Sequence, residues 1–173
     1  MPEKNILSEA WEFAKSLAVA ALAAAIIITY VVQPFVIPSG SMEPILRRGD
    51  RILVVKFAYV WREPARGDVI VFKYPPEPAS DFVKRALGLP GDTVAITRGK
   101  LFVNGAPVAE PYLTGSAGAN FGPVTVPEGH YFMLGDNRPA SKDSRSWGFV
   151  PRANLRGRAV VIIWPIHRVR GLR

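Results

Sequence analysis

The feature that most constrains this chain is an uncharged, largely apolar segment near its N-terminus. No residue in the range 16–42 carries a charge, and residues 16–32 read SLAVAALAAAIIITYVV. As an α-helix these residues extend roughly 25 Å at about 1.5 Å per residue, whereas the hydrocarbon core of a bilayer is about 30 Å thick. Snorkelling of Lys15 adds the two apolar residues before it, which brings the span to about 20 residues. Gln33-Pro34 then ends the helix, because a residue before proline disfavours the α region.

Three interpretations of this segment compete: a buried core helix, a cleaved signal peptide and an uncleaved membrane anchor. A buried core helix needs more protein around it than so small a chain provides, because a helix that is apolar on all sides must be covered on all sides. A cleaved signal peptide follows a basic N-terminal region, whereas here acidic Glu3, Glu9 and Glu12 accompany Lys4 and Lys15. We therefore interpret residues 16–34 as a single uncleaved transmembrane anchor and residues 1–15 as a short N-terminal tail.

The charges of the chain leave its topology and its partner open. Arg47, Arg48 and Arg51 follow the anchor, and the positive-inside rule places them in the cytoplasm, but the rule weakens before a large folded domain. The net charge of +8 and the pI near 10.1 suit anionic lipid, nucleic acid or a merely solvated basic surface. The absence of cysteine excludes disulfides, thiol catalysis and Cys-ligated metal. Two histidines are too few for a His-rich metal site.

From Asp50 onward the sequence changes to short runs rich in Val, Ile and Phe, bounded by turn residues. These runs are RILVVK (51–56), DVIVFK (68–73), TVAI (93–96), KLFV (100–103), YFML (131–134) and AVVIIW (159–164). Asn104-Gly105 between two of them predicts a type I′ hairpin turn. We therefore predict a mainly β protein, in which residues 35–167 form a compact antiparallel β-sheet domain. Within it, the Gly-, Pro- and Ala-rich residues 105–127 form a loop or small excursion, and residues 168–173 form a basic C-terminal tail.

Ser41 is the first candidate for chemistry, because it sits in a turn, Pro38-Ser39-Gly40-Ser41, directly after the apolar segment. Such a turn is also an ordinary junction between elements. A serine nucleophile needs a base to take its proton. His130, in a turn before a strand, and His167, in the basic tail, have no neighbouring motif that suggests this role.

A lysine is the alternative base, and it becomes competent only where desolvation lowers its pKa. Lys84 fits this requirement, because strand alternation in residues 81–87 places it on one face with the apolar residues Phe82 and Ala86. The alternative interpretation of Lys84 is an edge-strand lysine that discourages aggregation or snorkels to water.

A third segment, residues 135–148, reads GDNRPASKDSRSWG directly after an apolar strand. It contains two acids, three basic residues and three serines. Such a loop is either a solvated turn or a set of hydroxyls and ion pairs that orient a catalytic group.

Together these segments resemble the conserved sequence boxes of bacterial type I signal peptidases, also called leader peptidases. The matching stretches are FVIPSGSMEPIL (35–46), GDVIVF (67–72), FVKRALGLPGD (82–92), GDNR (135–138) and SKDSRSWGFVP (141–151). They occur in the family's order behind a membrane segment, over about residues 16–165. The resemblance implies a membrane-anchored Ser–Lys endopeptidase of the signal-peptidase fold.

The resemblance implies roles for individual residues. Ser41 is the nucleophile, Lys84 is the general base, and the Ser39 hydroxyl with the Ser41 backbone N–H forms the oxyanion hole. Ser141 orients the lysine amine by a hydrogen bond, and Asp143 and Arg145 form a supporting ion pair. The residues that line the shallow substrate pockets are Phe35, Ile37, Met42, Phe82 and Val83. No cofactor and no metal is required.

Three departures from the family pattern are visible. Ile45 stands where threonine is common, and Phe82 stands where tyrosine is frequent, so a phenol hydroxyl is lost and the ring is kept. Pro139-Ala140 replace a polar pair before Ser141. The short interval between Lys84 and Gly135 predicts that the inserted subdomain of some members is reduced.

The resemblance also implies substrates and location. The substrates are secretory preproteins, cleaved after a small-x-small (Ala-x-Ala) motif, near the secretion translocon and without nucleic acid. The tail at 1–15 is then cytoplasmic, and the β domain lies on the extracytoplasmic face of the bacterial cytoplasmic membrane. We expect the cluster Phe57, Tyr59, Val60 and Trp61 to dip into lipid, and ordinary core packing is its alternative. Two other functions remain open: a self-cleaving Ser–Lys autoprotease, and a non-enzymatic, membrane-tethered basic β module.

Overall fold

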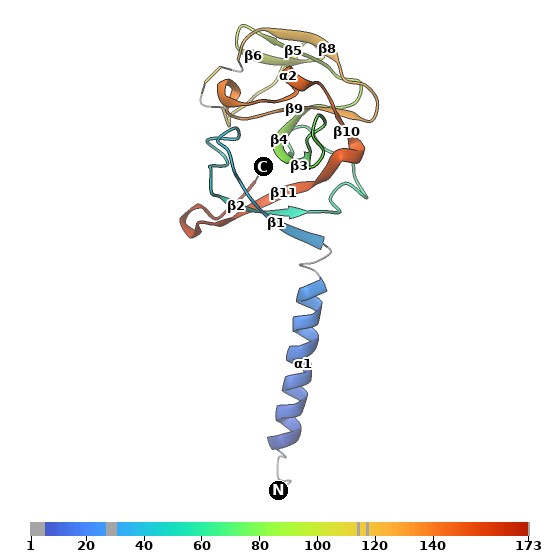
Figure 1. Cartoon of the computed structure of the whole chain (residues 1–173), viewed down its shortest axis with the longest axis vertical. Helices are drawn as coiled ribbons and strands as arrows, with labels where there is room; N and C mark the ends of the chain where they lie inside the picture. Colours follow the sequence, from blue (N-terminus) through green and yellow to red (C-terminus); the bar gives the residue numbers. More distant parts are fainter. Residues whose placement is uncertain (1–5, 27–30, 114, 117, 173) are drawn as a thin grey trace.

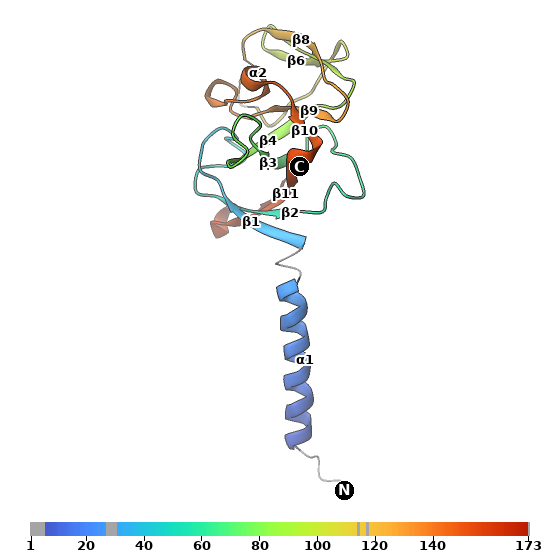
Figure 2. The same cartoon turned by 45° about the vertical axis from the view of Figure 1, so that its right-hand side comes forward.

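The computed structural model describes residues 6–26, 31–113, 115–116 and 118–172. Helix α1 (Ile6–Ile26) lies apart from the β domain, as a rod below it (Figures 1 and 2). Its large apolar side chains are exposed, among them Trp11, Phe13, Leu17, Val19 and Leu22. In the described part of the chain, no helix meets the combined length and hydropathy of a membrane span.

The main sheet is antiparallel throughout and positions the candidate catalytic residues. Its strand order is β1-β2-β11-β3-β4-β9-β10, and β12 pairs with β11 outside this path. The strands are β1 (Val32–Val36), β2 (Arg51–Val55), β3 (Val69–Lys73), β4 (Asp81–Gly88), β9 (His130–Leu134), β10 (Val150–Pro151), β11 (Leu155–Trp164) and β12 (Arg170–Gly171). The prediction of a mainly antiparallel β domain is therefore confirmed.

A second, four-stranded sheet lies at the end of the domain opposite α1 (Figures 1 and 2). Its order is β7-β6-β5-β8, formed by β5 (Thr93–Thr97), β6 (Lys100–Val103), β7 (Ala106–Pro107) and β8 (Phe121–Thr125). Asn104 and Gly105 both have positive φ, and Val103 pairs with Ala106, as the predicted hairpin requires. The excursion at 105–127 therefore contains the two outer strands of this sheet.

Alternating apolar side chains explain why these strands form and where they pack. One core cluster, which includes Ile52, Val54, Val71 and Ile162, lies beneath β1, β2, β3 and β11. A second cluster joins the two sheets, and a third packs around Ile70, Phe72 and Met133. The short helical segments are η2 (Arg138–Ala140), α2 (Ser144–Trp147), η3 (Arg152–Asn154) and η4 (Ile166–Arg168).

The structure differs from the predicted boundaries at both ends of the β domain. The sheet begins at Val32, inside the range 16–34 assigned to the anchor, because residues 32–36 pair with β2 in regular antiparallel register. The predicted C-terminal tail is part of the fold. Arg168 forms an ion pair with buried Asp50, β12 pairs with β11, and Leu172 enters the core.

Candidate active site

Ser41 lies in a tight turn that leaves β1 and is held by buried neighbours. The Glu43 N–H donates to the Gly40 carbonyl at 3.1 Å, and the Leu46 N–H donates to the Met42 carbonyl at 2.9 Å. Met42 and Leu46 are fully buried in the core beneath the turn. The turn that carries Ser41 is therefore fixed by packing against the core.

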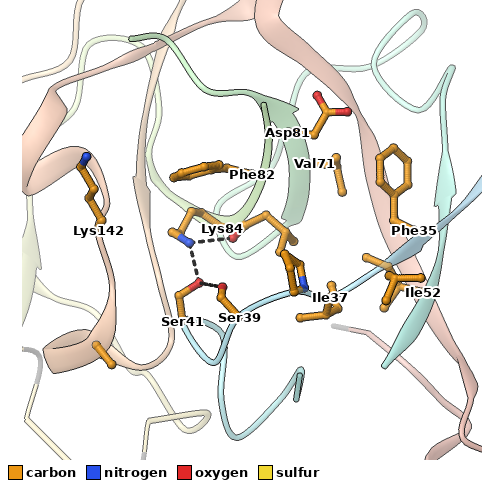
Figure 3. Close-up of a pocket in the computed structure, with 14 residues that line it drawn as sticks. Phe35, Ile37, Ser39, Ser41, Ile52, Val71, Asp81, Phe82, Lys84 and Lys142 are labelled. Atoms are coloured by element: carbon orange, nitrogen blue, oxygen red, sulfur yellow. Dashed lines mark hydrogen bonds between the residues drawn. The ribbon is translucent and has the colours of Figure 1, made fainter. Parts of the chain in front are cut away.

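Lys84 of β4 meets this turn. Its Nζ lies 2.6 Å from Ser41 Oγ and 3.1 Å from the Val83 carbonyl oxygen, as Figure 3 shows. Only 3% of Lys84 and 7% of Ser41 is exposed. β4 pairs with β3 on one side and β9 on the other. The pairing with β9 begins at Arg85, and Lys84 itself pairs with Ile70 of β3. The alternative of an edge-strand lysine that reaches water is nevertheless wrong, because the side chain is buried.

Burial is the main cause of the unusual acidity of the Lys84 ammonium. It lowers the pKa of Lys84 from 10.5 to about 8, because the charged form loses its hydration. The negative charges of Asp143 and Asp136 act in the opposite direction and limit the decrease. The amine is thus half neutral near pH 8, which makes it able to take a proton from Ser41.

The described partners of Ser41 Oγ are Lys84 and Ser39, whose hydroxyl oxygen lies 3.4 Å away. Ser39 is exposed, two residues before the nucleophile in the same turn. This geometry places a second hydroxyl beside Ser41 Oγ, and a hydroxyl in such a position can donate to an oxyanion.

The histidines lie elsewhere in the fold. His130 begins β9, and its Nδ1 contacts the Glu128 carbonyl oxygen at 2.8 Å, while His167 lies in η4. In the described ranges, no three His, Asp or Glu side chains gather as metal ligands.

The loop between β9 and α2 packs beside Ser41 and Lys84 and holds the backbone there in place. Asp143 is fully buried, and its carboxylate accepts from the Gly135 N–H at 3.1 Å and from Arg145 Nε at 2.8 Å. It also accepts from the Arg145 N–H and so caps α2. A side chain at Gly135 would collide with Ser141 Oγ and the Ser41 carbonyl oxygen, so the end of β9 can approach Ser41 only because this residue is glycine.

The structure does not form one contact that the family resemblance implies. Ser141 Oγ is buried next to Gly135, but it has no hydrogen-bond partner among the residues that the structure describes. Nζ of Lys84 instead donates to Ser41 and Val83. Ser141 is therefore brought into the site without orienting the amine in this conformation.

Sequence reasoning missed several residues that hold the site together. Asn137 donates from its backbone N–H to the Ser41 carbonyl and from Nδ2 to the Gly40 carbonyl, both at 3.0 Å. Arg85 and Asp136 form a buried bidentate ion pair at 2.9 and 2.7 Å. The GDNR segment (135–138) was the sequence signal that could have identified these residues. The groups that Asn137 and Asp136 contact, the Ser41 turn and Arg85, lie far away along the chain.

A groove of about 330 Å³ runs beside the Ser41–Lys84 pair. Its described lining includes four of the five predicted substrate-contacting residues, namely Phe35, Ile37, Phe82 and Val83. Met42 is not among the residues that line it, because the side chain is buried in the core under the turn. The groove wall is mostly apolar, with Asp81 near the Phe35 side and Lys142 on the other side of the pair in Figure 3.

Comparison with known proteins gives a consistent result. Residues 10–164 match the family model "Signal peptidase, peptidase S26". The chain is 43% identical over 165 residues to "Probable signal peptidase I-2" of Synechocystis, covering 91% of this chain and 75% of that protein. It is 44% identical over 149 residues to "Signal peptidase I" of Leptolyngbya laminosa, covering 82% and 73%. The crystal structure of a signal peptidase I from Enterococcus faecalis matches with a TM-score of 0.52 and 37% identity, over 56% of this chain and 97% of that one.

Proposed function

The chain belongs to the signal peptidase S26 family and has the activity of a signal peptidase I, a serine peptidase that removes signal peptides, and we propose that the Ser41–Lys84 pair performs the reaction. One observation carries this assignment of residues. A buried lysine amine with a lowered pKa lies 2.6 Å from a serine hydroxyl in an open groove.

In the first step, neutral Lys84 takes the proton of Ser41 as Oγ attacks the carbonyl carbon of the last signal-peptide residue. The carbonyl oxygen becomes an oxyanion, which the Ser39 hydroxyl and the Ser41 backbone N–H stabilise. One such donor typically lowers the activation barrier by about 3–4 kcal/mol. The Lys84 ammonium then gives its proton to the leaving amine, which departs as the N-terminus of the mature protein.

In the second step, the neutral amine of Lys84 takes a proton from water, and the hydroxide attacks the ester that joins the signal peptide to Ser41. Collapse of the second tetrahedral intermediate returns the proton to Ser41 Oγ and releases the signal peptide as a free carboxylate. Asp143 and Arg145 fix the Gly135 backbone beside the nucleophile, and Asn137 fixes the two carbonyls of the Ser41 turn.

The groove supports cleavage after a small-x-small motif. Strand β1 with its continuation to Ser41 forms one wall, and Phe82, Val83 and Lys84 of β4 form the other. A substrate added between them as an extended strand places alternate side chains on the same face. Two residues that are two positions apart therefore face the apolar wall, and the residue between them points away.

We assign an anchoring role to the apolar N-terminal segment, which ends before Val32. The support is its charge-free sequence and the exposed Leu17, Val19 and Leu22 of α1. The β domain then lies on the extracytoplasmic face, where preproteins emerge.

A lipid contact by the loop after β2 is consistent with part of the aromatic cluster. Trp61 is 86% exposed and Val60 60%, and Phe57 is also exposed. Tyr59 is buried, and its hydroxyl donates to Asp68, so it belongs to the core. Trp61→Ala should weaken liposome binding by the full chain, whereas unchanged binding contradicts the contact.

The decisive experiment compares the wild type, Ser41→Ala and Lys84→Ala on a separate preprotein in neutral detergent. Both variants should lose cleavage, and Lys100→Ala, which alters an exposed lysine on β6, should keep it. Cleavage in trans separates a signal peptidase from a self-cleaving autoprotease. Undiminished cleavage by Ser41→Ala would remove the proposed nucleophile.

A further inference from the structure

Lys142 lines the catalytic groove but has no part in the Ser41–Lys84 chemistry. It lies between η2 and α2 and is exposed. In Figure 3 the Ser41–Lys84 pair separates Lys142 from Phe35 and Ile52. The groove therefore continues past the nucleophile to a cationic side chain.

The position of Lys142 is well defined by its surroundings. Its Nζ lies 5.4 Å from the centre of the Tyr74 ring, and Tyr74 stacks face to face on Phe82 with 4.2 Å between the ring centres. The following residue, Asp143, is fully buried, and the preceding Ser141 carbonyl accepts from Arg145 at 3.4 Å. Cation–π contact over a buried ring and a fixed backbone hold the amine at the groove wall.

Lys142 is also the charged side chain of the groove that is free to form an ion pair with a substrate. Asp81 forms an ion pair with Arg156 at 3.2 Å, and Lys84 is buried with its amine on Ser41. Among the described residues, no carboxylate forms a salt bridge with Lys142, whose neighbour Asp143 directs its carboxylate to Gly135 and Arg145.

The direction of the substrate rests on the proposed function. Phe35 and Ile37 line the groove beside Ser41 and are residues for which the family resemblance implies substrate pockets, so the signal-peptide residues before the scissile bond are placed along them. The residues after the bond leave past Ser41, where Ala140 and Lys142 form the lining. An extended chain advances about 3.3 Å per residue, so only the first few residues of the mature protein pass this wall.

We propose that Lys142 is a specificity-determining residue that binds an acidic side chain within the first three residues after the scissile bond. This inference rests on the proposed function. It concerns which preproteins are cut fastest and leaves the chemical step to Ser41 and Lys84. An acidic side chain there forms a charge-assisted hydrogen bond with the amine, whereas a lysine is repelled.

The test uses one preprotein with Glu, Gln or Lys at each of the first three positions after the cleavage site, and the full chain in neutral detergent at low salt. At the position that faces Lys142, we expect kcat/KM for Glu to exceed that for Gln by about two- to fivefold, the scale of an exposed ion pair. The Lys substrate should fall below Gln by a similar factor. Salt at about 0.5 M should reduce both differences.

Lys142→Gln should abolish the difference in kcat/KM between the Glu, Gln and Lys substrates, Lys142→Glu should invert it, and Lys100→Gln should behave as wild type. Equal rates of the wild type on all nine substrates overturn the inference and leave the proposed function intact. No cleavage of any substrate instead removes the proposed function.

Two further results exclude other roles for Lys142. A loss on all substrates with a shifted pH–rate profile in Lys142→Gln shows an effect on Lys84, which overturns the inference. A Lys142-dependent response to anionic lipid vesicles without substrate discrimination shows a lipid contact, which overturns it as well.

Discussion

Burial of Lys84 should make the wild-type protein less stable at neutral pH than a variant that carries an apolar residue there. The pKa of Lys84 falls from 10.5 to about 8 on folding. At about 1.4 kcal/mol per unit, this shift costs about 3 kcal/mol of folding free energy wherever the unfolded chain holds the proton. Lys84→Met keeps the length of the side chain and loses hydrogen bonds worth about 1 kcal/mol. At pH 7 the variant should therefore be more stable by about 2 kcal/mol, although inactive.

The sign of the pH dependence follows from proton binding. Between about pH 8 and 10.5 the unfolded lysine holds a proton that the folded lysine has released, so the free energy of unfolding of the wild type rises with pH. The penalty is complete below about pH 8 and is relieved by about pH 10.5. The advantage of Lys84→Met should thus disappear across this window.

The assay is urea unfolding of both full chains in the same neutral detergent, followed by tryptophan fluorescence at several pH values from 7 to 10.5. The difference between the two free energies of unfolding cancels the titration of the other groups. A constant difference across this range, or a variant that is less stable at pH 7, would refute a depressed pKa at Lys84.

Three other predictions follow from the same site. The acid limb of kcat/KM should have a midpoint near pH 8, because the base must be neutral; a midpoint near 6.5 would indicate a histidine instead. Ser39→Ala should lower kcat by about 100-fold with little change in KM, because an oxyanion donor acts in the transition state; steady-state kinetics that show a KM effect alone contradict this role. Asp136→Asn removes the carboxylate from buried Arg85 and should destabilise the fold by about 3–5 kcal/mol, which thermal unfolding measures; a loss below about 1 kcal/mol would contradict it.

Much of the architecture is visible in local sequence patterns. Short runs of β-branched and aromatic residues predicted the strands, and Asn104-Gly105 predicted the hairpin, because both depend on near neighbours. The boundaries of the sheet were less accessible. Val32 joins β1 and Arg170 joins β12 because partner strands are available, and no local pattern identifies such partners.

The sequence by itself determined the apolar N-terminal segment and the β domain and, through its resemblance to a family, singled out Ser41 and Lys84 as candidate catalytic residues. Only the tertiary structure decided that the Lys84 amine is buried against Ser41, and this burial lowers its pKa. The tertiary structure also decided that Met42 packs in the core beneath the Ser41 turn and that Asn137 donates to the Gly40 carbonyl of that turn. It decided as well that Ser141 Oγ makes no hydrogen bond to the Lys84 amine. The physical reason is that burial and hydrogen bonding depend on residues remote in the chain, whereas a sequence pattern reports mainly on neighbours.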